Sequence, residues 1–190
     1  MALEWQPTIF IFIFIFMFIG IFININIHEF GHFIFGKIFG YRLISYRIGF
    51  LTWNYENGKM KFQIIRNRGY GGLCAMVPPD KELPRYKSIL FFSGGILFNL
   101  LSGSIFILTA FLLPAPESLK IFCYVTGAFA LVLGIVNFIP FVSGNNPTDG
   151  KIIWSLVLRN PFAEKLIEMN KLTSQLSAGV RPRDLQISLP

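Results

Sequence analysis

The sequence predicts an all-α polytopic membrane protein with a core of three transmembrane helices, a small cytoplasmic β-hairpin and a C-terminal amphipathic helix. Three observations support this fold class. The 190-residue chain is 53% hydrophobic and only 14% charged, whereas soluble chains carry about a quarter charged residues. It contains three apolar segments that reach the length of about 20 residues that a helix needs to cross the hydrocarbon core. Its basic residues gather on one side of these segments.

The predicted spans cover residues 8–39, 87–113 and 119–141. The first opens with alternating isoleucine and phenylalanine from Ile9 to Phe18. Alternation indicates a half-buried strand only when one partner is polar, so this segment is predicted to be a helix. A cleavable signal peptide would have basic residues before its apolar stretch, and Glu4 stands there instead. We therefore expect a retained span. Pro114 to Pro116 makes the turn between the second and third spans.

The charges predict the orientation in the membrane. Of the 17 basic residues, ten lie from Lys37 to Lys87, six lie from Lys151 onward, and only Lys120 lies on the other side. By the positive-inside rule, the N-terminus and the 114–118 turn are outside, and the 41–87 loop and the C-terminal tail are cytoplasmic. We expect a multi-pass protein of the plasma membrane. This distribution indicates that the net charge of +7 serves contact with the surface of the lipid bilayer. No nucleic-acid partner is therefore expected.

The first span contains the sequence His28-Glu29-Phe30-Gly31-His32, a HExxH motif. Positions four apart share one helix face, so both imidazoles can bind one Zn²⁺, and Glu29 is placed to take a proton from a water at the metal. The protein has two histidines, and both lie in this motif. The alternative is two histidines packed against helices without a metal, which the cost of burying such groups in apolar surroundings disfavours. The motif lies within the bilayer, nearer its cytoplasmic face.

The third metal ligand is expected to be a carboxylate, because catalytic zinc usually takes three protein ligands and no third histidine exists. Asp149 follows the inner end of the third span, at about the depth of His28. It is therefore the best candidate on topology, whereas Glu117 lies in the outer turn. The alternative role for Asp149 is the N-cap of a helix that starts near Lys151. The two roles are compatible.

The order of the motifs resembles that of the site-2 protease family of intramembrane zinc metalloproteases. After the HExxH motif, the second span contains Gly95-Ile96-Leu97-Phe98-Asn99, which is similar to the family's Gly-Pro-x-x-Asn signature. Asn137-Phe-Ile-Pro140 and later Asp149-Gly150 follow the third span. The resemblance covers about residues 8–155. It implies that His28, His32 and Asp149 bind zinc and that Glu29 is the general base.

The chain departs from the family pattern at two places. Ile96 stands where the signature has proline, which removes a helix kink but no ligand. Eight residues separate Pro140 from Asp149, whereas the common family form has a shorter gap. The segment 141–147 must therefore loop out so that Asp149 reaches the metal, and its glycine, asparagine and proline content suits a loop.

Two asparagines are candidates for stabilising an oxyanion or positioning a substrate. Asn99 and Asn137 each have an amide that can donate a hydrogen bond. Each could instead bridge two helices, as polar side chains in membranes commonly do. Both roles stay open for Asn99, and helix bridging is favoured for Asn137. Gly20 and Asn24 continue the spacing of four from the two histidines, so this stripe is predicted to face the other spans.

The loop at 41–76 is predicted to form a β-hairpin. Residues 43–54 and 59–66 are rich in strand formers, and Asn57-Gly58 between them is a strong hairpin turn. The resemblance implies a membrane-associated element here that pairs with an extended substrate. Such pairing makes physical sense, because a substrate helix must unwind before its peptide bond is exposed. A hairpin that only caps the site is the alternative.

We expect residues 1–159 to form the membrane core and residues 160–190 a cytoplasmic tail. Asn160-Pro161 predicts a helix start, and an apolar stripe follows at Phe162, Leu166, Met169, Leu172 and Leu176. The resemblance implies a zinc metalloendopeptidase that cuts a transmembrane protein or membrane-bound peptide, in regulated intramembrane proteolysis or in processing of peptides and signal remnants. The alternatives are a non-catalytic metal-binding scaffold and a membrane metalloprotease of another family that cuts soluble segments. The sequence identifies neither the substrate nor a regulatory partner.

Overall fold

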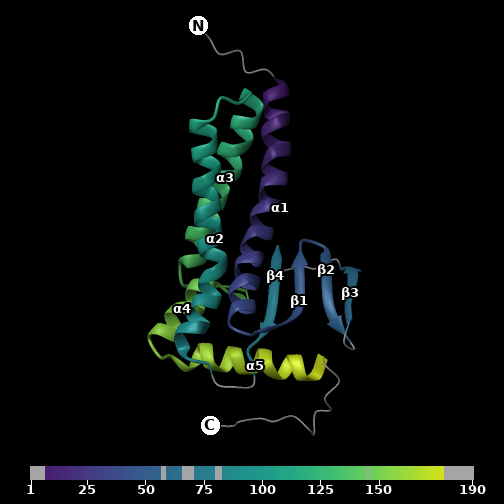
Figure 1. Cartoon of the computed structure of the whole chain (residues 1–190), viewed down its shortest axis with the longest axis vertical. Helices are drawn as coiled ribbons and strands as arrows, with labels where there is room; N and C mark the ends of the chain where they lie inside the picture. Colours follow the sequence, from purple (N-terminus) through teal and green to yellow (C-terminus); the bar gives the residue numbers. More distant parts are fainter. Residues whose placement is uncertain (1–6, 57–58, 66–70, 80–82, 145, 178–190) are drawn as a thin grey trace.

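The structure is a computed structural model, and it describes residues 7–56, 59–65, 71–79, 83–144 and 146–177. The elements follow one another as α1 (Pro7–Ile38), β1 (Arg42–Ile48), β2 (Leu51–Glu56), β3 (Lys59–Ile64), β4 (Gly72–Val77), α2 (Arg85–Leu112), α3 (Glu117–Phe138), β5 (Val142–Ser143), β6 (Asn146–Pro147), α4 (Asp149–Val157) and α5 (Pro161–Ser177). Three long helices stand side by side, and the strands β1–β4 lie beside the lower half of α1 (Figure 1).

Among the described residues, α1, α2 and α3 are each long and apolar enough to cross a membrane. Their bounds agree with the predicted spans to within three residues at each end. The largest difference is at the end of α3, which stops at Phe138 because Ile139 is extended. A residue that precedes a proline disfavours the helical conformation, so Pro140 explains this stop. The prediction of three apolar helices is confirmed.

Small residues allow the three helices to approach closely. A Cβ atom on Gly31 of α1 would overlap the backbone of Gly94 in α2, and a Cβ on Gly94 would overlap that of Gly31. Gly20 of α1 faces Thr126 of α3, and Asn24 Nδ2 donates a hydrogen bond to the Thr126 carbonyl at 2.8 Å. The predicted stripe of spacing four on α1 therefore faces the other two helices. Close backbone approach through small residues is the usual way in which helices pack in membranes.

After the end of α1, the chain turns back and runs alongside this helix. Gly40 adopts a φ of 82°, the left-handed region that glycine enters most readily. The Tyr41 N–H donates to the Gly36 carbonyl, and the Gly40 N–H donates to the Lys37 carbonyl, which is the Schellman pattern of a helix C-terminus. Strand β1 then runs back beside α1. Its Tyr46 hydroxyl donates to Asn26 Oδ1 at 2.9 Å, so the sheet is attached near the HExxH motif.

The strands form a larger sheet than the predicted hairpin, so the protein is mostly helical but not strictly all-α. Its four strands are antiparallel in the order β3-β2-β1-β4. The predicted pairing of β2 with β3 is present, with Glu56 opposite Lys59, while the turn residues 57–58 lie outside the described residues. The predicted strand at 43–54 is two strands, because Gly49 takes a positive φ of 58° and turns the chain. Strand β4 adds a fourth, and it forms one edge of the sheet.

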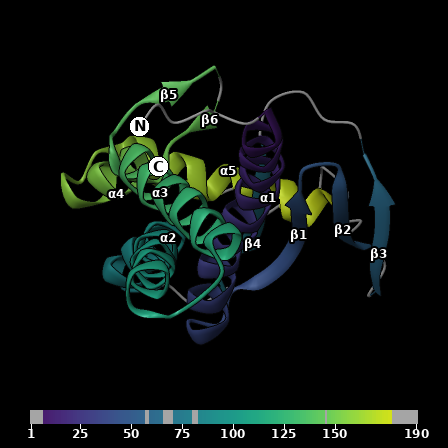
Figure 2. The ribbon, with the colours of Figure 1, turned by 90° about the horizontal axis from the view of Figure 1, so that it is seen from above.

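Helices α4 and α5 close the lower end of the molecule. Ile152 and Leu156 of α4 form a small buried core with Ala163 of α5, and Phe92 of α2 packs against it. Helix α5 lies across the lower ends of α2 and the sheet (Figure 1). Figure 2 shows the molecule from above, with α1 between the α2–α3 pair and strands β1–β3. Of the predicted apolar stripe of α5, Leu166 packs against this small core, whereas Met169 is exposed.

Candidate metal centre

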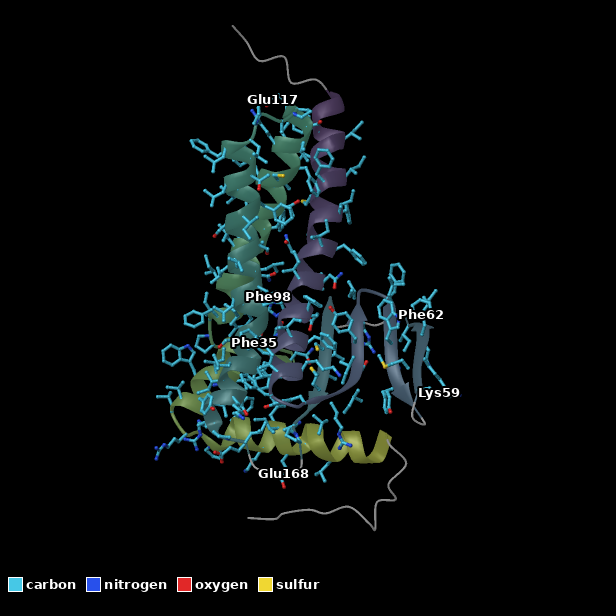
Figure 3. All side chains as sticks on the ribbon, viewed as in Figure 1. Phe35, Lys59, Phe62, Phe98, Glu117 and Glu168 are labelled. Atoms are coloured by element: carbon cyan, nitrogen blue, oxygen red, sulfur yellow. The ribbon has the colours of Figure 1, made fainter. Side chains whose placement is uncertain are left out.

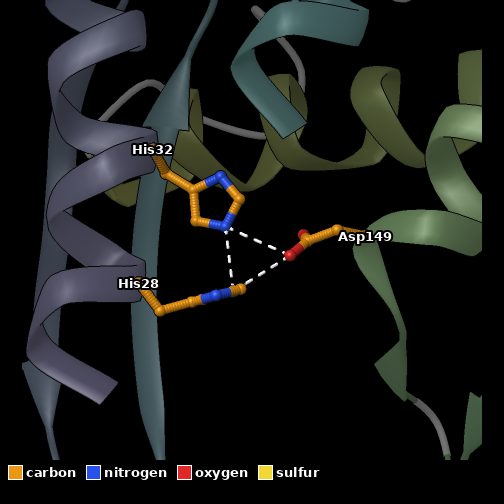
Figure 4. A group of neighbouring side chains, drawn as sticks. All are labelled: His28, His32 and Asp149. Carbon is orange, nitrogen blue, oxygen red and sulfur yellow. Dashed lines mark hydrogen bonds and ion pairs between the residues drawn. The ribbon is translucent and has the colours of Figure 1, made fainter. Parts of the chain in front are cut away.

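Three side chains from two distant parts of the chain meet beside the middle of the fold. His28 and His32 extend from one face of α1, and Asp149 reaches them from the first residue of α4 (Figure 4). The two Nε2 atoms are 3.3 Å apart. Asp149 Oδ2 lies 3.0 Å from His28 Nε2 and 3.3 Å from His32 Nε2. The structure therefore brings together the three residues that the sequence proposes as metal ligands.

The geometry of these three atoms fits a tetrahedral zinc site. Tetrahedral Zn²⁺ with bonds of about 2.0–2.1 Å places neighbouring ligand atoms about 3.3 Å apart, close to the three spacings observed. Asp149 Oδ2 is buried and makes no hydrogen bond of good geometry among the described residues, although it lies near both imidazoles. Burial alone would raise the pKa of Asp149, but the imidazoles of His32 and His28 outweigh it and hold the pKa well below its usual range. A buried anionic oxygen close to two imidazole nitrogens is a donor set that suits a bound cation.

Local structure after α3 explains why Asp149 reaches the histidines. The eight-residue gap contains a short hairpin in which Val142 pairs with Pro147, and this hairpin takes up the extra residues. Thr148 is the N-cap of α4: its hydroxyl accepts from the Lys151 N–H at 3.2 Å and donates to the Ile139 carbonyl at 2.7 Å. The cap that was considered for Asp149 is therefore made by the residue before it. The Asp149 carboxylate is free to face α1.

Gly150 lets α4 begin directly against the end of α3. A Cβ atom at Gly150 would overlap the backbone carbonyl of Phe138. In the Asp-Gly pair, Asp149 is the candidate ligand, and Gly150 allows the close contact between α4 and α3 that places it.

Helix α2 lies against the far side of both imidazoles. His32 Nδ1 is 2.9 Å from the Phe91 carbonyl, which can only accept, so Nδ1 carries the proton and Nε2 is free to bind a metal. His28 Nδ1 is 3.2 Å from Asn99 Nδ2. Gly95 lies between these two contacts, and a Cβ there would come within 2.6 Å of both rings. The sequence identified Gly95 only as part of the family signature and gave no sign of the Phe91 carbonyl, although the spacing of four from Phe91 to Gly95 to Asn99 repeats that of the histidines.

Glu29 is held next to the ligands by strand β4. Its side chain is buried, and the carboxylate accepts a hydrogen bond from the backbone N–H of Cys74. Gly72 leaves room for this carboxylate, because a Cβ at Gly72 would come within 2.5 Å of Glu29 Oε1. Burial raises the pKa of the Cys74 thiol, so it remains a neutral neighbour rather than a thiolate.

A cavity of about 580 Å³ opens onto the three ligands and Glu29. All six residues of β4 line one part of it, and the β5–β6 hairpin lines another. Asn137 also lines the cavity, and its Nδ2 donates to the Leu133 carbonyl of its own helix at 3.0 Å. Asn99 is fully buried and is not part of the cavity lining. The two asparagines therefore occupy different positions: Asn137 faces the cavity and Asn99 lies behind His28.

Replacing Gly95 with alanine should weaken zinc binding by on the order of 100-fold or more. The added methyl group would push His28 and His32 away from their present positions. Zinc affinity of the purified variants, measured by competition with a chromophoric chelator, checks this. Gly103→Ala is the matched control, since a methyl group there meets α3 at 2.9 Å but lies two turns away from the histidines. Equal zinc affinities in the two variants would contradict the prediction.

The comparisons with known proteins agree with this site. No curated protein and no solved structure matches the chain significantly. One family model, described as Peptidase family M50, matches residues 16–116, which is more than half of the chain. The matched segment contains the HExxH motif, β4 and Asn99, and it ends before Asp149, so that residue is supported by its geometry. Because this match covers more than half of the chain, the chain belongs to peptidase family M50, the site-2 protease family of membrane metalloproteases.

Proposed function

We propose that the protein is an intramembrane zinc metalloendopeptidase that hydrolyses a peptide bond of a membrane-embedded substrate near the cytoplasmic face. One observation carries this proposal. A buried carboxylate, Glu29, lies beside a triad of metal-ligand type, and both open onto a cavity next to an unpaired strand edge. A base, a metal site and a place for an extended chain are the parts that peptide hydrolysis needs.

His28, His32 and Asp149 would hold the zinc ion. When bound there, zinc supplies a Lewis acid that polarises the scissile carbonyl and makes a water molecule more acidic. Glu29 is the next residue after His28, and its carboxylate is aligned by the Cys74 N–H. We infer that Glu29 takes the proton from the attacking water and returns it to the leaving amine, the role of a general base that then acts as a general acid.

The outer edge of β4 is the proposed binding strand for the substrate. Among the described residues, β4 pairs with β1 along one edge, and no strand pairs with its other edge. In an antiparallel sheet, the N–H and C=O groups of successive residues point to opposite edges. The Cys74 N–H points to Glu29, on the side away from β1, so the groups of Gly72 and Met76, two residues to either side, face this edge as well. A substrate that unwinds can replace its lost helical hydrogen bonds with these groups. Its backbone would then run past the metal ligands.

The oxyanion of the reacting carbonyl needs a donor that faces the cavity. Asn137 is the side-chain amide in that position, and one of its two N–H groups is already bound to the Leu133 carbonyl. The second N–H is available to a substrate oxygen, since the amide nitrogen has two. We propose Asn137 for this role. Asn99 is proposed below for a different one.

The lipid bilayer is the proposed surrounding of α1, α2 and α3. Large apolar side chains such as Phe18 and Phe111 are more than half exposed, which favours contact with lipid. Glu117 lies where α2 meets α3, and Glu168 lies on α5 at the opposite end (Figure 3). All basic residues except Lys120 lie between Lys37 and Lys87 or from Lys151 onward, the parts of the sequence that contain the strands, α4 and α5, so by the positive-inside rule this end is cytoplasmic and the start of α1 is outside. We propose the plasma membrane as its location.

The substrate is proposed to be a single-span regulator, a signal-peptide remnant or a membrane-bound propeptide. The test uses the purified protein in proteoliposomes with a single-span model substrate. We expect cleavage in the cytoplasmic half of the substrate span, loss of cleavage with 1,10-phenanthroline, and recovery with added Zn²⁺. A glycine pair in that half of the span should accelerate cleavage relative to leucine, because it eases unwinding.

Three outcomes would reject this proposal. Cleavage that resists the chelator would exclude a metalloprotease. Stoichiometric zinc without cleavage of any membrane substrate would favour the scaffold alternative. Cleavage of soluble segments alone would favour a membrane metalloprotease that acts outside the bilayer.

A further inference from the structure

Asn99 is in contact with a metal ligand from the side that faces away from the cavity. Its side chain is fully buried between helices, and its Nδ2 is 3.2 Å from His28 Nδ1. His28 Nε2, on the opposite side of the ring, faces Asp149 and His32. The amide is therefore placed to act on the ring of His28, and it lies outside the lining of the cavity where a substrate would bind.

Only one tautomer of the neutral His28 ring leaves Nε2 able to bind a metal. For Nε2 to offer a lone pair to a cation, the proton of the neutral ring must be on Nδ1. Nδ1–H then needs an acceptor. His32 has one in the Phe91 carbonyl at 2.9 Å. For His28, the group within reach is the Asn99 amide.

The Asn99 amide has an unused acceptor. With Nδ2 toward His28, the buried Oδ1 atom has no hydrogen-bond partner among the described residues. The nitrogen and oxygen of an amide have nearly the same shape, so the hydrogen-bond network decides which of them faces a neighbour. A half-turn of the amide brings Oδ1 to His28 Nδ1–H. This single change satisfies both the proton and the buried oxygen.

Helix α2 is shaped for this contact. Phe91, Gly95 and Asn99 are spaced four apart, so they lie on one face. Gly95 lets this face lie flat against both rings, because a Cβ there would overlap them. One stripe of α2 thus provides a backbone acceptor for His32, room for both rings, and a side-chain acceptor for His28.

We propose that Asn99 is a positioning residue whose amide oxygen accepts the Nδ1 proton of His28 and fixes this ring as an Nε2 metal ligand. The inference rests on the proposed zinc site. Groups that bind the second nitrogen of a histidine ligand typically change metal affinity by about 10–100-fold when removed. Asn99→Leu keeps the size and loses the acceptor, so zinc affinity should fall by about this factor. Asn99→Asp keeps an acceptor and should bind zinc within a few-fold of wild type.

Asn24 provides a matched control. It is equally buried on α1, one turn before His28, and it donates to the Thr126 carbonyl rather than touching a ligand. Asn24→Leu should lower the melting temperature but leave the zinc affinity of the folded protein unchanged. Affinities are measured by chelator competition on the monodisperse fraction after gel filtration. Asn99→Ala, which adds no bulk, gives the same comparison if Asn99→Leu does not fold.

The results separate this inference from the proposed function. Weaker zinc in Asn99→Leu and recovery in Asn99→Asp, with Asn24→Leu unchanged, support it. It is overturned if both leucine variants lose zinc equally, if Asn99→Leu binds like wild type, or if Asn99→Asp binds as poorly as Asn99→Leu. Folded wild-type protein that binds no zinc would reject the metal site itself.

Discussion

Glu29→Gln is expected to bind a full equivalent of zinc and to cleave its substrate about 10²–10⁴-fold more slowly than wild type. Loss of a general base has an effect of this size. Glutamine has the same shape and can still accept the Cys74 N–H through its amide oxygen, so the fold around it should persist. It cannot take a proton from water. His28, His32 and Asp149 keep their contacts, so the ability to bind metal is retained.

The measurement combines metal analysis of the purified variant with initial rates on a single-span substrate. Glu117→Gln is the matched control, because this glutamate is the first residue of α3 at the opposite end of the molecule, is strongly exposed, and pairs only with Lys120 among the residues described. It should retain the wild-type rate. Activity retained by Glu29→Gln would reject the proposed mechanism, and loss of zinc from Glu29→Gln would show that Glu29 supports the metal site rather than the reaction.

The two histidines illustrate what the sequence can predict. A spacing of four places two side chains on one helix face without any tertiary information, and the structure has their Nε2 atoms 3.3 Å apart. The same local periodicity predicted the three apolar helices. The observed ends lie at prolines and glycines that stop a helix, such as Pro140 and Gly40, although the predicted third span ran past Pro140 to residue 141. These are features that a short stretch of chain determines by itself.

The sheet shows where such reasoning stops. The pairing of β2 with β3 is local and was predicted, but β4 pairs with β1 across about 30 residues of chain. No short-range pattern states which distant strand will be its partner. Strand β4 is the strand that holds Glu29 and lines the cavity, so the element nearest the proposed chemistry was the least visible in the sequence. Gly49 was the available signal that residues 43–54 contain a turn.

Asn99 shows a similar limit for a single residue. Its distance from Gly95 placed it on the same side of α2 as the glycines, so a position near the histidines was foreseeable. Which side of the His28 ring it would contact depends on how α1 and α2 are rotated against each other, and Gly31 and Gly94 set that contact. The packing between α1 and α2 therefore determines whether Asn99 contacts a bound substrate or His28.

Asp149→Ala is expected to weaken zinc binding by about 10²–10³-fold and to abolish cleavage at limiting zinc. Structural zinc sites with four ligands bind with about 10–16 kcal/mol, or about 2.5–4 kcal/mol for each ligand, and about 1.4 kcal/mol corresponds to a factor of ten. Asp149 is the only carboxylate of the described residues that joins the two histidines in a metal-binding group. Glu164, an acidic residue of α5, pairs instead with Arg85 at 3.2 Å on the surface.

Chelator competition on the folded protein gives the zinc affinity. Three further variants test whether a loss of zinc is specific to the Asp149 carboxylate. Glu164→Ala should bind zinc like wild type. Asp149→Asn keeps an oxygen but loses the negative charge, so its affinity should lie between those of wild type and Asp149→Ala. Thr148→Ala removes the N-cap that places Asp149 and should cost about 1 kcal/mol of stability, with a smaller loss of zinc than Asp149→Ala. Full zinc and full activity in Asp149→Ala would show that the hairpin between α3 and α4 does not deliver the third ligand, and that another group completes the site.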